Sequence, residues 1–85
     1  MPRVARPKDS EMRQKLHQLG ILIRLHRMSK QLSPDELSQL AGISVYRITR
    51  YEAGQIDPPF SALCQIAKAL GMDVADLLKH ESFKV

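Results

Sequence analysis

The chain has 85 residues, which is enough for one hydrophobic core and too few for two. Apolar residues make up 44% of it, but there is no Trp and there are only two Tyr and two Phe, so aliphatic side chains must build the core. This composition favours packed helices over a β-sandwich. The net charge of +4 is concentrated in residues 1–30, which carry eight Lys or Arg and two acidic residues. This favours a polyanionic partner, with a solvated basic face as the alternative.

The sequence excludes several classes of protein. The longest uninterrupted apolar run, Ile21–Ile23, is far too short to span a membrane, and the N-terminus lacks the apolar region of a signal peptide, so we expect a cytoplasmic protein. The single cysteine, Cys64, excludes an internal disulfide and is expected to be a small buried hydrophobe. The histidines His17, His26 and His80 lack metal-ligand spacing, and we expect neither a metal nor a cofactor.

The N-terminal third predicts an arm followed by a helix. Residues 1–9 contain two prolines and three basic side chains and are expected to be a flexible basic arm. Asp9 or Ser10 would cap a helix that ends near Ser29. Its apolar positions recur at helical steps: Met12, Leu16, Leu19, Leu22, Ile23 and Leu25. Gly20 lies within this helix and indicates that another element approaches it closely.

The segment Ser33-Pro-Asp-Glu36 predicts the start of a second helix. Ser33 and Glu36 have the spacing of a capping box, and Pro34 occupies a first-turn position that needs no amide donor. Gly42 suits the left-handed residue that ends a helix. The expected inward face of this helix consists of Leu37, Leu40 and Ala41.

A third helix is predicted to restart at once. Ser44 is a suitable N-cap, residues 45–53 continue the helix, and Gly54 ends it. Two short helices joined by a glycine turn form the helix-turn-helix pattern, in which the second helix is the one that enters the DNA groove.

Two further helices complete the predicted fold. After the proline-containing loop 55–59, the fourth helix is expected to use Asp57 as its cap, because Pro59 stands where Ser or Thr is common. Its inward positions are Phe60, Leu63, Ile66, Ala67 and Leu70, before Gly71. Asp73 would cap a fifth helix with Val74, Leu77 and Leu78 facing inward. We therefore predict an all-α five-helix bundle over residues 10–79, followed by a C-terminal tail, 80–85.

From Leu19 to Leu78 the sequence resembles the lambda-repressor/Cro-like family of helix-turn-helix regulators, also called the XRE family. The matching residues are Leu32-Ser33-x-x-Glu36-Leu37-x-x-Leu40-Ala41-Gly42-Ile43-Ser44, Ile48-x-x-Tyr51-Glu52-x-Gly54, Pro58-x-x-x-x-Leu63-x-x-Ile66-Ala67-x-Ala69-Leu70-Gly71 and Leu77-Leu78. The resemblance covers most of the chain and preserves spacing across four connections. It implies a lambda-repressor-like DNA-binding domain.

The resemblance also implies an ion pair between Arg27, late in the first helix, and Glu52, near the end of the third. A carboxylate that faced phosphate would be repelled, whereas one paired to a bidentate guanidinium fixes two helices together. Both residues are therefore expected to be structural and not to read bases.

Helical spacing places Val45, Tyr46, Thr49 and Arg50 on the side of the third helix opposite the inward-facing Ile48. The resemblance implies that Val45, Tyr46 and Arg50 occupy the positions that reach base edges. Arg50 can donate two parallel hydrogen bonds to guanine, and Val45 and Tyr46 can contact a thymine methyl group. The alternative is that this stripe is simply solvated.

Phosphate contacts are expected to hold the third helix in register. The candidates are Ser44 at its N-terminus, Arg47 beside the stripe, Gln55 and the backbone amide of Ile56. Pro34 is a departure from the family pattern. Many relatives carry Gln at this position, and Pro34 cannot supply the phosphate hydrogen bond of that side chain.

These features predict a sequence-specific transcriptional regulator that binds double-stranded operator DNA through the major groove. We expect a homodimer on a two-fold symmetric operator, with a dimer surface offered by Val74, Leu78, Phe83 and Val85. The alternative is a protein-interaction module, antitoxin-like or a co-regulator, with the same fold. No nucleophile–base set, phosphate-binding glycine loop or effector pocket is evident, so we expect neither an enzyme nor a small-molecule binder. The basic arm could follow phosphates, aid dimerisation or be a solvated tail.

Overall fold

The computed structural model describes residues 6–79, with side chains from residue 10 onward. Every regular element in this range is an α-helix. These are α1 (Arg6–Ser29), α2 (Pro34–Ala41), α3 (Val45–Glu52), α4 (Phe60–Ala69) and α5 (Val74–Leu77). The expected all-α, five-helix architecture is confirmed. No helix within 6–79 has both the length and the hydrophobicity needed to cross a bilayer.

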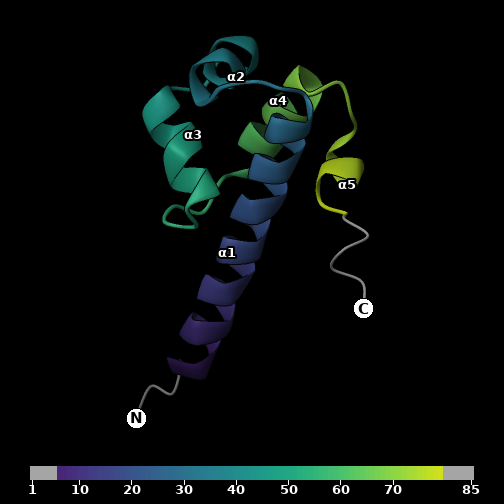
Figure 1. Cartoon of the computed structure of the whole chain (residues 1–85). Coiled ribbons are helices and arrows are strands. Elements are labelled where there is room, and N and C mark those ends of the chain that lie inside the picture. The colour runs from purple at the N-terminus through teal and green to yellow at the C-terminus, as the bar shows by residue number, and fades with distance from the viewer. Residues whose placement is uncertain (1–5, 80–85) are drawn as a thin grey trace.

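One long helix organises the molecule. Figure 1 shows α1 as a straight rod, with α2, α3, α4 and α5 gathered around its C-terminal half. Its main contacts are with α3, while α2 and α4 pack on each other and α5 closes the bundle against α4 and α1. The N-terminal half of α1 projects beyond the other helices (Figure 1).

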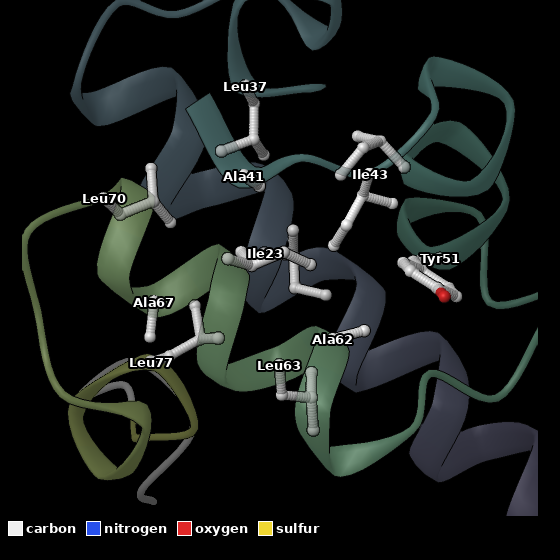
Figure 2. Close-up of a cluster of buried hydrophobic side chains, with 12 residues drawn as sticks. Ile23, Leu37, Ala41, Ile43, Tyr51, Ala62, Leu63, Ala67, Leu70 and Leu77 are labelled. Atoms are coloured by element: carbon white, nitrogen blue, oxygen red, sulfur yellow. The ribbon is translucent and has the colours of Figure 1, made fainter. Parts of the chain in front are cut away.

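The core lies where all five helices meet. Ile23 of α1 is fully buried and lies among side chains from the other helices (Figure 2). The fully buried aliphatic side chains are Ile23, Leu37, Ile48, Ile66 and Leu77. Burial of each stabilises the fold by about 1.5–3 kcal/mol relative to leaving it exposed. Because Ile48 belongs to this core, the core itself sets the orientation of α3.

The connections around α2 follow from local sequence. Ser33 Oγ accepts a hydrogen bond from the Glu36 amide at 3.0 Å, and the Glu36 carboxylate accepts one from the Ser33 amide at 2.7 Å, so the predicted capping box is present. Gly42 ends α2 in the left-handed region with a φ of 71°. Upstream, Gln31 adopts a φ of 59°, and the Leu32 amide donates to the Arg27 carbonyl, which stops α1 at the predicted place.

The predicted start of α1 was wrong. The helix begins at Arg6 and not at Asp9 or Ser10, so residues 6–9 of the expected arm are helical. Pro7 does not prevent this, because the first helical turn has no internal partner for its amides. Residues 1–5 of the expected arm and the expected tail, 80–85, lie outside the described residues.

Some positions expected to face inward are exposed. Leu40 is 61% exposed and Phe60 is 65% exposed, and Leu78, Met12 and Leu25 also face solvent to a large extent. Helical spacing identifies the apolar side of a helix but not how far its neighbours reach around it. Each of these side chains lies beyond the edge covered by the adjacent helices.

The expected cap of α4 was also wrong. Pro59 is the N-cap residue and makes no side-chain hydrogen bond, so Asp57 lies two residues too early for the role. Asp73 does occupy the N-cap of α5, but without a side-chain hydrogen bond to the helix. Cys64, expected to be buried, is half-buried.

Candidate nucleic-acid interface

The outward face of α3 is fixed by its inward face. Ile48 is fully buried, and the Tyr51 ring is 2% exposed within the core cluster. Ser44 caps the helix, its Oγ accepting a hydrogen bond from the Arg47 amide at 3.2 Å. With one side held by the core, the opposite side must face solvent, and this side carries the stripe predicted from the sequence.

The structure places all four predicted base-reading residues on this outward face. Tyr46 is 58% exposed, Val45 and Thr49 are exposed, and Arg50 is half-buried. The Arg50 guanidinium lies over the Tyr46 ring, 4.7 Å from its centroid. Thr49 Oγ1 donates to the Tyr46 carbonyl at 2.9 Å, so its hydroxyl is partly occupied by its own helix. Tyr46 and Arg50 therefore form one unit on the exposed surface.

Contacts extend this unit toward the loop that follows α3. A guanidinium nitrogen of Arg50 donates to the side-chain carbonyl of Gln55, the first residue after Gly54. Gln55 was predicted to contact phosphate, and it lies exposed at the edge of the same surface. The side chain of Ile56 packs against the core cluster, so only its backbone can serve a phosphate.

Sequence reasoning missed the partner of Arg47. Its Nε and Nη2 donate to the Tyr51 hydroxyl at 3.1 and 2.8 Å, and its guanidinium lies 5.7 Å from the Tyr51 ring centroid. Figure 2 shows the Tyr51 oxygen at the edge of the hydrophobic cluster. The spacing of four residues on one helix is the signal that would have identified this pair. The contact with Tyr51 holds the Arg47 side chain beside the outward stripe.

Arg27 and Glu52 lie together as the resemblance implied. Nε and Nη2 of Arg27 donate to the two carboxylate oxygens of Glu52 at 2.7 and 3.0 Å, and Nη1 donates to the Leu32 carbonyl at 2.7 Å. Both side chains are largely buried, at 11% and 9% exposed. The hydrogen bond to Glu52 raises the pKa of Arg27, and burial opposes this only in part. The pair ties the end of α3 to α1 and to the α1–α2 turn.

A second contact brings α1 and α3 together. A Cβ atom on Gly20 would lie 2.5 Å from the Tyr51 carbonyl oxygen and closer still to that of Glu52. Gly54, with a φ of 73°, approaches α1 in the same way, since a Cβ there would lie 2.9 Å from Cα of His17. The close approach expected at Gly20 is present, and it sets how far α3 stands out from α1.

The electrostatics of this face suit an anion. Arg47 and Arg50 are its charged side chains, and residues 44–51 contain no acidic residue. The N-terminus of α3 adds the positive end of a helix dipole. The N-terminus of α2 is less favourable to an anion, because Asp35 and Glu36 lie in its first turn. The Glu36 carboxylate is occupied by the capping box.

The described residues hold no group of three or more His, Cys, Asp or Glu side chains able to bind a metal ion. The surface hollows lined by the described residues are open to solvent. One of them is lined by Ser10, Arg13, Gln14, His17 and Gln18 of α1.

The helix-turn-helix class of DNA-binding proteins is defined by two short helices joined by a turn and packed on the core through one side, with the second helix exposing its other side. In this chain α2 and α3 have that arrangement, and the exposed side of α3 is basic. Residues 18–79 match the model of a helix-turn-helix domain family, and the chain belongs to that family. It is an XRE-like protein of the Cro/C1 type and a DNA-binding transcription regulator. A comparison with curated protein sequences gives no match.

Solved structures of regulators share this fold. The restriction-modification controller protein C.AhdI from Aeromonas hydrophila is 27% identical, with a TM-score of 0.72 over 73% of this chain and 94% of that one. The clp gene regulator ClgR from Corynebacterium glutamicum is 28% identical, with a TM-score of 0.72 over 75% of this chain and 68% of that one. The competence regulator ComR from Streptococcus vestibularis is 32% identical, with a TM-score of 0.71 over 84% of this chain but 24% of that one.

Proposed function

We propose that the chain is a sequence-specific regulator that inserts α3 into the major groove of operator DNA and reads bases with Tyr46 and Arg50. The observation that carries the proposal is the stacked Tyr46–Arg50 unit on the exposed side of a helix whose other side is fully buried. An α-helix fits the major groove, and a guanidinium can pair with guanine O6 and N7. Val45 and Thr49 border the same unit and contact neighbouring bases.

Phosphate contacts flank the base contacts in this proposal. Arg47 reaches one strand from its position against the Tyr51 hydroxyl, where the (i, i+4) pair preorganises its guanidinium. Gln55 and the backbone amide of Ile56 meet the backbone at the other end of α3, and Ser44 lies at the helix N-terminus, where the free amides favour an anion. These contacts set the register, and the base contacts provide the specificity.

We further propose that two copies bind a two-fold symmetric operator, because one module buries only about 600–1,000 Å² on DNA. Half-sites about 34–36 Å apart would place both α3 helices on one side of the duplex. Leu78 is exposed beside α5 and is a candidate for the dimer surface, whereas Val74 is largely used by the core. Phe83 and Val85 lie outside the described residues.

The test compares Arg50→Ala with Arg47→Ala on DNA selected by the parent protein from a random pool. Arg50→Ala is expected to lose about 1–3 kcal/mol of discrimination at one position per half-site, because it removes a bidentate contact to a base. Arg47→Ala is expected to weaken binding to all sequences and to reduce the salt slope of log K by about 0.9 per bound copy. Binding curves at several salt concentrations measure both effects.

Arg24→Ala is a matched control, since Arg24 is an exposed arginine on α1, outside α3. If the parent selects no sequence, or if both α3 variants bind DNA as the parent does, the base-reading proposal is wrong. Loss of a protein partner in those same variants would instead favour the interaction-module function.

A further inference from the structure

The N-terminal part of α1 precedes the segment that matches the family model. The family match begins at residue 18, whereas α1 begins at Arg6. Residues 6–17, named here the α1 extension, are therefore helical but precede the matched domain. Figure 1 shows this part of the rod running past the loop that follows α3, away from the bundle. Among its described side chains, Leu16 is half-buried and the others are exposed, so burial in the core accounts for little of this segment.

One face of the extension looks toward the side of the molecule that carries α3. Gly20 contacts the last carbonyls of α3, and His17 contacts Gly54 of the following loop. Arg13 lies seven residues before Gly20 and four before His17, so helical geometry places it on the same side of the rod, beyond the end of α3.

This face is polar and basic. The hollow along it is lined by Ser10, Arg13, Gln14, His17 and Gln18, with no apolar side chain among them. It is also continuous with the proposed DNA surface, because Gln55, which contacts Arg50, follows the glycine that rests on His17. Charge and continuity thus point to the same ligand, the sugar-phosphate backbone of the DNA that α3 would bind.

An apolar edge lies next to this polar face. Met12, 49% exposed, and Leu16, half-buried, lie about 100° and about 60° around the helix from Arg13, and a second copy is the competing occupant of that edge. Lys15 lies two residues from Arg13, about 200° around the helix, and faces away from α3. It carries the same charge and is also exposed, which makes it a matched control.

We propose that the α1 extension is a second DNA contact, in which Arg13 binds a backbone phosphate outside the base pairs that α3 reads. The proposal rests on the proposed function of α3 and widens its footprint. The extension projects past the end of α3 and beyond the other helices (Figure 1). The long arginine side chain can form a charge-assisted hydrogen bond to phosphate.

The experiment compares the full-length parent with Arg13→Gln and Lys15→Gln. Arginine, lysine and glutamine have similar helix propensities, so neither substitution should disturb α1. The probe is the selected operator with long flanks or, if none is selected, one duplex of arbitrary sequence. Arg13→Gln is expected to reduce the salt slope of log K by about 0.9 per bound copy, so for each copy its deficit in affinity shrinks about 3.5-fold between about 50 and about 200 mM salt. Lys15→Gln should keep the parent slope. Trimming the flanks should lower the parent slope to that of Arg13→Gln.

Equal slopes for the parent and both variants, or equal losses in both variants, overturn the proposal. So does a change in oligomer mass caused by Arg13→Gln, since it would assign this face to a second copy. Failure of the α3 proposal is distinguished by Arg50→Ala, whose base discrimination does not depend on flank length. If Arg50→Ala relaxes base preference while Arg13→Gln matches Lys15→Gln, only the extended footprint is rejected.

Discussion

Substitution of Glu52 by alanine is expected to lower the free energy of unfolding by about 3–5 kcal/mol. The variant leaves the Arg27 guanidinium, 11% exposed, without the carboxylate that accepts two of its hydrogen bonds. The Leu32 carbonyl remains as an acceptor but cannot neutralise the charge. Urea unfolding monitored by circular dichroism measures the loss, and the m-value should stay unchanged.

A double variant separates the lost pair from the stranded charge. Arg27→Met combined with Glu52→Leu should recover most of the stability, because an apolar pair can replace a buried ion pair at little cost. Glu11→Ala, an exposed carboxylate on α1, is the control and should change stability by less than about 0.5 kcal/mol. A loss below about 1 kcal/mol for Glu52→Ala would mean that the pair behaves as a surface salt bridge.

Gly20→Ala is expected to lower the free energy of unfolding by about 1–3 kcal/mol even though alanine is the better helix former. The new Cβ would lie 2.5 Å from the Tyr51 carbonyl oxygen and 2.8 Å from the carbonyl carbon of Glu52. Both contacts are with backbone, which cannot move aside as a flexible side chain could. The end of α3 would have to move away from α1, and DNA affinity should fall with it.

The comparison for Gly20→Ala is Gln18→Ala, an exposed position two residues away on the same helix. Gln18→Ala should leave stability within about 0.5 kcal/mol of the parent. Thermal unfolding of both variants measures the difference. If Gly20→Ala raises the stability by the value expected from helix propensity alone, then α1 and α3 do not approach each other as closely as described.

Local signals in the sequence predicted much of the fold. The capping box at Ser33 and Glu36, the glycine that ends α2 and the serine that starts α3 act within a few residues, so their outcomes do not depend on the rest of the chain. The burial of Ile48 then fixed the exposed stripe of α3, because helical geometry leaves no freedom once one side is assigned.

Features that depend on the neighbours of a helix were harder to predict. Leu40 and Phe60 lie at the correct helical spacing, but the adjacent helices do not extend far enough to cover them. The start of α1 was placed too late, because the two prolines and the basic residues of that segment suggested an arm. A proline in the first helical turn is compatible with a helix, and Pro7 occupies that turn.

Side-chain partners across the candidate site were predicted only where a pattern specified them. The resemblance indicated that Arg27 meets Glu52, but the contacts of Arg47 with Tyr51 and of Arg50 with Gln55 were not anticipated. Arginine has many rotamers, and its choice among nearby acceptors depends on the final positions of α3 and its loop. Spacing identifies which residues face outward but not which of the available partners each one selects.

Insertion of α3 into the major groove is tested most directly by dimethyl sulfate protection on the selected operator. This reagent methylates guanine N7, an atom exposed in the major groove and the acceptor proposed for Arg50. We predict that the parent protects one guanine in each half-site and that Arg50→Ala restores its methylation while the complex remains bound. A saturated complex in which no guanine N7 changes reactivity would contradict the placement of α3 in the groove.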